Sequence, residues 1–389
     1  GNTLSTSEYA GSIDMSNSIF DVYNCPESEV TPVWVDVEEE VEVDFSSSVG
    51  ELCSITDDVW VSPWGDDNNL GTSENQAFQT IGRALEMIAP DEDNSITIYL
   101  TGGTETNPDV FAPSTTEENF PIIMISNVNL IGQGEDVTIL DAEGANRVIL
   151  INNSDNNIIE ECNFYYPTAS ERMLGTTNGV GTLNVLEIDA NSHYNTIKKC
   201  LFENAEGEAF RIKGTNNTIE NNYFHHIDWS VSDLEGLMTT IYSGSNAEAN
   251  TFTKNTIHTT GASATVLPGI NSEFSYNKVT NTGLLQSDGA VFQGTTKFVE
   301  GSNVHHNFVY DTEKYAYRYD AAADDPSGAG NYGVMHHNIA DNTNGLMAKG
   351  NNQVIAHNTI LNTKNGKNDI VLLSEACSNT NTWLYNNLA

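Results

Sequence analysis

One short pattern recurs nine times along this chain: an apolar residue, two further residues, an asparagine, one residue and a second apolar residue. Seven of the nine central positions are Asn and two are Cys. The centres are Cys162, Cys200, Asn222, Asn255, Asn277, Asn307, Asn338, Asn358 and Asn387, and successive centres lie 20 to 38 residues apart. A repeat of this length with insertions is typical of a solenoid in which each copy forms one coil.

The composition of the repeat predicts strands. The apolar residues are spaced for short strands, and Asn, Gly, Thr and Ser, which do not favour helices, lie between them. An Asn at each bend tolerates left-handed backbone and can hydrogen-bond its counterpart one coil away. We therefore predict an all-β chain that forms a right-handed parallel β-helix, with the nine centres stacked as one ladder.

Three segments carry a family resemblance: NNTIENNYFHHI (216–227), NVHHNFVYDT (303–312) and NQVIAHNTILNT (352–363). They resemble the repeats of the pectate-lyase-like superfamily of parallel β-helices. The stretches 59–88 and 127–142 are similar to the usual opening and first full coil of that group, so the similarity covers about residues 57–389. The superfamily contains lyases, glycoside hydrolases, esterases, phage tailspikes and adhesins. The resemblance thus implies the fold and leaves the activity open.

Two regions are predicted. Residues 1–56 do not follow the repeat and are predicted to be a β-rich segment, or the tail of a preceding β-helical unit. Residues 57–389 are predicted to form the β-helix. A capping helix is expected at 80–88, with Thr80 as its N-cap. Its apolar face would close the open end of the coil and cover a sheet edge; that face consists of Ile81, Ala84, Leu85 and Ile88. Insertions at 167–182, 228–236, 281–288 and 320–331 are expected on a binding face.

Charge restricts the partners. The chain has 54 acidic and 15 basic residues, a net charge of −39, which disfavours nucleic acid and anionic membranes as partners. No apolar stretch is long enough for membrane insertion. The abrupt ends of the chain suggest part of an exported protein, extracellular or on a cell surface. The acidic surface is either an adaptation to salt water or a source of calcium ligands, with candidates at 66–69, 91–94 and 324–325.

The chain has five cysteines, so at least one cannot pair within it. Cys25 and Cys53 flank an acidic run and are expected to form a disulfide in an exported protein. Cys162 and Cys200 share the ladder column, where stacked coils are about 4.8 Å apart, so they either pair or stack as buried thiols. Cys377 has no evident partner.

Candidate functional residues come from a second strand that follows each Asn bend. The segments 207–214, 288–294, 315–320 and 345–350 can be overlaid. Alternation then directs one set of side chains outward: Arg211, Lys213, Gln293, Arg318, Asp320 and Lys349. Asp288, Arg318, Asp320 and Lys349 would lie within roughly 10 Å along the axis, because coils stack at about 4.8 Å.

A histidine column is predicted beside the ladder. His306, His337 and His357 each precede a ladder Asn, and His305 and His336 precede two of them. The column is either a stacked polar ladder at a tight bend or a row that transfers protons or shares a metal cation. The basic column likewise either balances nearby acids or forms a groove for an anionic sugar, bordered by His306 or His337.

Polysaccharide is the predicted partner, and the predicted activity is that of a lyase or a glycoside hydrolase. A uronate lyase needs cations for the sugar carboxylate and a base at C5, roles that Arg318, Lys349, His306 or His337 could fill. A hydrolase needs two carboxylates, and Asp288 and Asp320 are the candidates. The predicted substrate contacts are Arg211, Lys213, Gln293 and Tyr319. The alternative is a non-catalytic structural or adhesive protein, such as a surface fibre, stalk or filament subunit that associates end to end.

Overall fold

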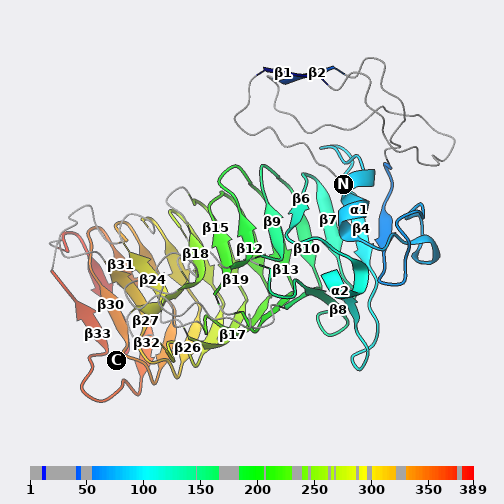
Figure 1. Cartoon of the computed structure of the whole chain (residues 1–389). Coiled ribbons are helices and arrows are strands. Elements are labelled where there is room, and N and C mark those ends of the chain that lie inside the picture. The colour runs from blue at the N-terminus through cyan, green and yellow to red at the C-terminus, as the bar shows by residue number, and fades with distance from the viewer. Residues whose placement is uncertain are drawn as a thin grey trace.

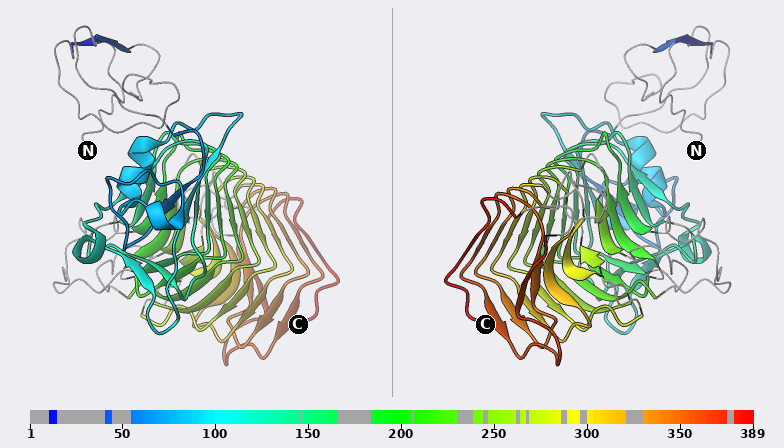
Figure 2. Two further views of the ribbon diagram at one scale, coloured as in Figure 1. Left: turned by 90° about the vertical axis from the view of Figure 1, so that its right-hand side faces the viewer. Right: turned by 90° about the vertical axis from the view of Figure 1, so that its left-hand side faces the viewer.

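The computed structural model describes residues 11–14, 41–44, 55–145, 147–165, 184–205, 207–229, 239–243, 247–261, 264–266, 269–285, 289–295, 300–320, 330–374 and 379–389. Three long sheets, parallel in all their strand pairings, wind into one solenoid (Figure 1). Views from its two ends show the coils stacked in chain order, blue to red (Figure 2). The predicted right-handed parallel β-helix is confirmed.

Ten successive coils contribute one strand to each sheet, and β3 and β34 extend the first sheet at its two ends. The first sheet contains β3 (Val59–Val61), β4 (Ile96–Leu100), β7 (Val128–Ile131), β10 (Ile158–Glu160), β13 (Thr196–Lys198), β16 (Thr218–Glu220), β19 (Thr251–Thr253), β22 (Glu273–Ser275), β25 (Asn303–His305), β28 (Val334–His336), β31 (Val354–Ala356) and β34 (Trp383–Tyr385). The second sheet contains β5 (Asp109–Phe111), β8 (Thr138–Asp141), β11 (Asn163–Tyr165), β14 (Leu201–Glu203), β17 (Tyr223–Ile227), β20 (Thr256–Thr260), β23 (Lys278–Thr280), β26 (Phe308–Tyr310), β29 (Ile339–Asp341) and β32 (Thr359–Leu361).

The third sheet carries most of the candidate residues. It contains β6 (Ile122–Met124), β9 (Ile149–Ile151), β12 (Asn184–Ile188), β15 (Glu208–Ile212), β18 (Thr239–Ser243), β21 (Ala264–Val266), β24 (Ala290–Thr295), β27 (Tyr315–Asp320), β30 (Leu346–Ala348) and β33 (Ile370–Leu372). Phe210 pairs with Ile241, and Phe292 with Tyr317 and then Leu346, so the predicted overlay of these strands has the right register.

The core is a set of apolar columns that run along the solenoid axis. Phe164, Phe202 and Phe224 pair in register on the second sheet, and successive ring centroids are 4.9 Å apart. The apolar residue three before each ladder centre is fully or almost fully buried in every coil except the last, where Leu384 is 37% exposed. Each coil thus buries its apolar face only by stacking on the next, as in other solenoids.

The predicted Asn ladder is present at the corner between the first and second sheets. From Asn222 to Asn387, each side-chain Nδ2 donates to Oδ1 of the next ladder Asn at 3.0–3.2 Å. The backbone N–H of Cys200 joins the ladder by donating to Asn222 Oδ1. Cys162 and Cys200 are buried free thiols, so of the two alternatives the stacked thiols are observed. Cys25, Cys53 and Cys377 lie outside the described residues.

The left-handed residue at this corner is not the ladder residue, as the sequence suggested, but the one before it. All nine have φ between 50° and 58°; they are Glu161, Lys199, Asn221, Lys254, Tyr276, His306, His337, His357 and Asn386. The left-handed turn directs this side chain outward and the next one, the ladder Asn, inward. The ladder side chain is thereby buried, and the preceding position is left to form an outer row.

A second ladder lies five residues before the first. Asn157, Asn195, Asn217 and Asn250 are joined by Nδ2 to Oδ1 bonds of 3.0–3.2 Å, and the N–H of Asn250 then donates to Ser272 Oγ. These side chains satisfy backbone N–H groups that the bend removes from the strand ladders. Two rows of buried amides therefore hold the first sheet at both of its bends.

Helices occur at the N-terminal end of the solenoid. Helix α1 (Ile81–Met87) buries Ile81, Ala84, Leu85 and Met87. Thr80 Oγ1 accepts from Arg83 N, which confirms the predicted N-cap. The Glu118 carboxylate accepts from Ile81 N and Gly82 N, two further N–H groups of the first turn. The short α2 (Pro113–Thr116) and the 3₁₀ turn η1 (Glu74–Gln76) complete this end, and neither α-helix is long and apolar enough to cross a membrane.

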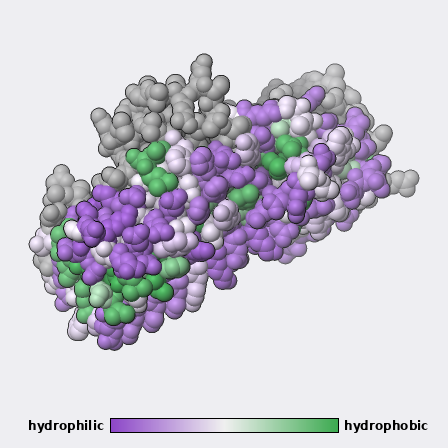
Figure 3. Space-filling model, turned by 90° about the horizontal axis from the view of Figure 1, so that it is seen from below, coloured by the Kyte–Doolittle hydropathy of each residue, from purple (hydrophilic) through white to green (hydrophobic). Residues whose placement is uncertain are grey.

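The N-terminal region and the final coil differ from the rest of the solenoid. Within 1–54 the structure describes only the paired strands β1 (Gly11–Asp14) and β2 (Val41–Asp44). The last coil exposes large apolar side chains, namely Leu372, Trp383, Leu384 and Leu388. Apolar residues also gather at one end of the largely hydrophilic surface in Figure 3. End-to-end association stays a prediction.

Candidate functional site

Three of the six predicted catalytic residues, Arg318, Asp320 and Lys349, meet on the outer face of the third sheet. Arg318 and Asp320 alternate with the inward-facing Tyr317 and Tyr319 on β27. Lys349 follows β30, where its N–H donates to Tyr319 O. The guanidinium of Arg318 forms an ion pair with Asp320 Oδ2, and Lys349 Nζ lies 2.8 Å from Asp320 Oδ1. The three side chains are only 14%, 11% and 7% exposed, so they form a mostly desolvated cluster.

Gln293 lies beside this cluster and is the most unusual residue of the face. It pairs in register with Arg318, and it follows the inward-facing Phe292 on β24. Its side chain is completely buried, and neither Nε2 nor Oε1 has a hydrogen-bond partner among the residues that the structure describes. A buried amide without partners costs free energy. Native structures contain few such groups, and each calls for an explanation, such as a catalytic role or a bound water or ion.

The other predicted substrate contacts are engaged in ion pairs on earlier strands of the same face. Arg211 is 2.9 Å from Glu208, and Lys213 pairs with Glu187 of the adjacent β12. Arg147 also pairs with Glu187. Every predicted basic residue of the column thus contacts a carboxylate, which agrees with local charge balance.

Sequence reasoning missed Arg147 and Glu187. Glu187 pairs in register with Arg211, and its place between the apolar residues Leu186 and Ile188 is the sequence signal that could have found it. The ion pairs hold the pKa of Glu187 below its usual value against the raising effect of burial, which is the largest single influence.

Some predicted site residues do not join the cluster. Tyr319 is buried in the core, where its hydroxyl donates to Ser302 O at 3.2 Å, so a substrate contact does not fit its position. Asp288 lies outside the described residues, as do most residues of the four insertions.

The histidines lie on the opposite side of the coil from Arg318. Tyr317 reaches across the core, and its hydroxyl donates to Asn307 O at 3.1 Å. The next residue, Arg318, points out of the solenoid on one side, and His306, the neighbour of Asn307, points out on the other. The prediction that His306 or His337 borders the charged cluster is therefore wrong.

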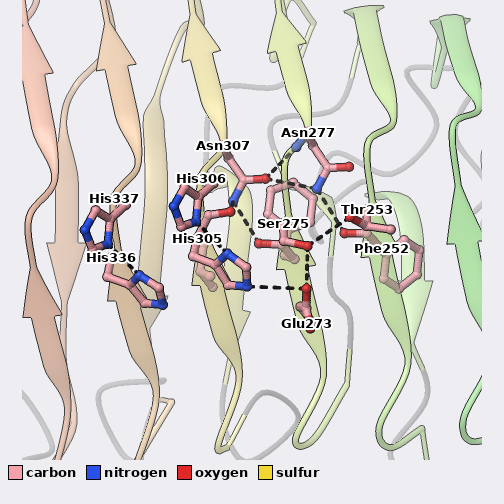
Figure 4. Close-up of polar contacts among 12 residues, drawn as sticks. Phe252, Thr253, Glu273, Ser275, Asn277, His305, His306, Asn307, His336 and His337 are labelled. Carbon is pink, nitrogen blue, oxygen red and sulfur yellow. Dashed lines mark hydrogen bonds and ion pairs between the residues drawn. The ribbon is translucent and has the colours of Figure 1, made fainter.

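The histidines form two stacked columns at the corner between the first and second sheets (Figure 4). In the outer row, ring centroids are 4.9 Å apart for Tyr276 and His306, 5.1 Å for His306 and His337, and 4.9 Å for His337 and His357. In the inner row, His305 and His336 are 4.9 Å apart. The predicted register is confirmed for all five histidines.

The inner row is poorly suited to carry positive charge. Partial burial lowers the pKa of His305, although Glu273 opposes the shift. The pKa of His336 falls to about 4, first because of burial and then because of the neighbouring imidazoles. At neutral pH these two rings are therefore uncharged and keep a free nitrogen lone pair.

The described residues of the acidic runs predicted to bind calcium include carboxylates that accept local hydrogen bonds within the fold. Asp67 accepts from Gln79 N, Thr80 N and Thr80 Oγ1 at the start of α1. Asp66 and Asp91 accept from backbone N–H groups two residues ahead, as in Asx turns. In the described part of the chain, no group of three or more His, Cys, Asp or Glu side chains is placed to hold a metal ion. Calcium stays a prediction.

Comparison with known proteins gives a likeness of fold. No family model and no curated protein matches the sequence. An alginate lyase from Paenibacillus sp. str. FPU-7 is 11% identical, with a TM-score of 0.48 over 78% of this chain and 97% of its own. DFA-IIIase from Arthrobacter chlorophenolicus A6 is 13% identical (TM-score 0.49; 79% and 77% covered), and PfbA, a surface adhesin of Streptococcus pneumoniae, is 13% identical (0.43; 75% and 82%). Such distant likenesses do not indicate what this chain binds.

Proposed function

We propose that this β-helix is an extracellular protein that binds polysaccharide on the outer face of the third sheet, around Gln293, Arg318 and Lys349. The observation that carries the proposal is the buried amide of Gln293, whose two polar atoms have no hydrogen-bond partner in the described part of the chain. A sugar hydroxyl both donates and accepts hydrogen bonds, so it can satisfy Oε1 and Nε2 together once the groups that bury Gln293 move aside. A bound sugar would thus turn an unfavourable feature of the free protein into a source of affinity.

The charged neighbours of Gln293 suggest the class of sugar. Arg318 and Lys349 converge on one carboxylate, that of Asp320. A uronate presents the same group, and it could engage the same two cations. Acidic polysaccharides therefore suit the face better than neutral ones, in spite of the overall charge of −39.

If the protein is an enzyme, elimination suits the described residues better than hydrolysis. Hydrolysis needs two carboxyl groups in separate roles, and here Asp320 is bound by two cations. Elimination needs cations that stabilise the uronate carboxylate as C5 loses its proton, and Arg318 and Lys349 can supply them. The proposed reaction is β-elimination from a uronate polymer: a base takes the C5 proton, the C4–C5 double bond forms, and the C4–O bond breaks as the leaving sugar oxygen takes up a proton. A non-catalytic adhesin would use the same contacts for binding alone.

The test is a screen of acidic and neutral polysaccharides for binding by calorimetry and for unsaturated product by ultraviolet absorbance. Arg318→Ala and Lys349→Ala should each weaken binding by tenfold or more, since each removes a charge-assisted contact. Lys278→Ala is the matched control, because Lys278 is an exposed residue on the second sheet. If the wild type binds none of the polymers, or if Lys278→Ala weakens binding as much as Lys349→Ala, the proposed site is wrong.

A further inference from the structure

Two adjacent histidine pairs share a geometry that the strand register does not require. Nδ1 of His305 lies 2.9 Å from Nδ1 of His306, and Nδ1 of His336 lies 2.8 Å from Nδ1 of His337. Within each pair the rings are almost perpendicular, at 89° and 88°. Figure 4 shows the two pairs side by side on successive coils. The same nitrogen atoms thus approach each other twice.

We propose that each pair, His305 with His306 and His336 with His337, binds one Cu²⁺ or Ni²⁺ ion through its two Nδ1 atoms. Imidazole nitrogens bind such metals at about 2.0–2.1 Å. Two ligands at a right angle around one ion are then about 2.9 Å apart, and two ligands at a tetrahedral angle are about 3.3 Å apart. The observed distances match the right angle, which square-planar and tetragonal Cu²⁺ and Ni²⁺ sites adopt and tetrahedral Zn²⁺ sites do not.

A carboxylate orients one of the four rings. Nε2 of His305 is 3.3 Å from Glu273 Oε1, so this nitrogen carries the proton and Nδ1 keeps its lone pair. Histidines that bind metals usually donate their other ring N–H to a carboxylate or carbonyl in this way. Glu273 is therefore a positioning residue for the first pair.

Each site has two protein ligands and is open to solvent. Among the described residues, no third His, Cys, Asp or Glu joins either pair. Water would complete each coordination shell, which Cu²⁺ and Ni²⁺ accept. His306 and His337 are exposed, so ions can reach both sites directly.

The chain contains its own comparison. His225 and His226 are also adjacent, and His226 has the same left-handed backbone, with φ of 57°. Their rings, however, are 6.0 Å apart at 42°, and His226 stacks on Trp229. The sequence His-His alone thus does not produce the arrangement, and this third pair should not bind the ion.

The test uses Cu²⁺ titrated into the full chain without an affinity tag, followed by calorimetry and electron paramagnetic resonance. The wild type should bind two ions, each with two imidazole nitrogens. The variant His306→Asn with His337→Asn should lose both ions, and His226→Asn should keep both. Asn occupies the same left-handed position in sister coils, as Asn221 and Asn386, so this variant should fold normally.

A further variant separates binding from a purely structural role. Glu273→Gln should lower the affinity for one of the two ions by about 10–100-fold and leave the affinity for the other unchanged, because only the first histidine pair contacts this carboxylate. The proposal fails if the wild type binds no Cu²⁺ at micromolar concentration, or if the double variant still binds two ions. Either result would show that the short distances are hydrogen bonds from one ring N–H to a bare nitrogen.

Discussion

Replacing Gln293 with Met should make the protein more stable and, at the same time, remove its polysaccharide binding. Met has a similar length and flexibility, and it has no amide to bury. The amide of Gln293 is completely buried and has no hydrogen-bond partner among the described residues, and such a group costs about 1–3 kcal/mol. We therefore expect the free energy of unfolding to rise by about 1–3 kcal/mol. If all 389 residues unfold together, the melting temperature rises by roughly 1 °C for each kcal/mol.

The assay is guanidinium unfolding of both proteins, with Gln133→Met as the control. Gln133 is exposed, so its replacement should change stability by less than about 0.5 kcal/mol. The reasoning would be refuted if Gln293→Met lowered stability by 1 kcal/mol or more, because the amide would then already be hydrogen-bonded in the free protein. A more stable variant that still binds as tightly as the wild type would refute the role of Gln293 as a ligand contact. Gains in stability that cost function are a known feature of binding sites.

Four further outcomes are expected. Asn277→Ala should lower the free energy of unfolding by about 2–4 kcal/mol, because it removes the acceptor of Asn255 N and the hydrogen bond from Asn277 Nδ2 to Asn307 Oδ1. The control Asn75→Ala, at an exposed position, should have almost no effect in the same denaturant titration. Phe224→Ala should cost about 3–5 kcal/mol by deleting a buried ring. Burial raises the pKa of the Glu118 carboxyl from 4.5 to about 7, so the folded state binds the carboxyl proton more tightly than the unfolded state does. The free energy of unfolding should therefore fall as pH rises from about 4.5 to about 7. Glu118→Gln should flatten the stability profile over this pH range. The calcium hypothesis predicts that a chelator at constant ionic strength lowers the melting temperature, and an unchanged value would contradict it.

The backbone fold was predictable because its cause is local and repeated. The apolar residues on both sides of each ladder centre recur in nine successive coils, and parallel stacking brings equal positions together. The second ladder was equally visible, since Asn157, Asn195, Asn217 and Asn250 each stand five residues before a centre.

The site was harder to predict because side-chain partners come from neighbouring coils and from the angle of each bend. Arg318, Asp320 and Lys349 were brought together correctly by register alone. Their separation from His306 depends on how far the chain turns between β26 and β27, which no residue pattern indicates. The pairing of Arg147 with Glu187 joins two strands across a long insertion, so spacing could not reveal it. Burial of Gln293 depends on what covers the sheet, and alternation says only that it points outward.

The most direct test of polysaccharide binding at this face is a crystal structure with a bound acidic oligosaccharide, taken from the polymer that the screen selects. We predict sugar hydroxyls within hydrogen-bond distance of Gln293 Oε1 and Nε2, and a sugar carboxylate on Arg318 and Lys349. An oligosaccharide bound at the histidine corner or elsewhere, with the Gln293 amide still without a partner, would contradict the account.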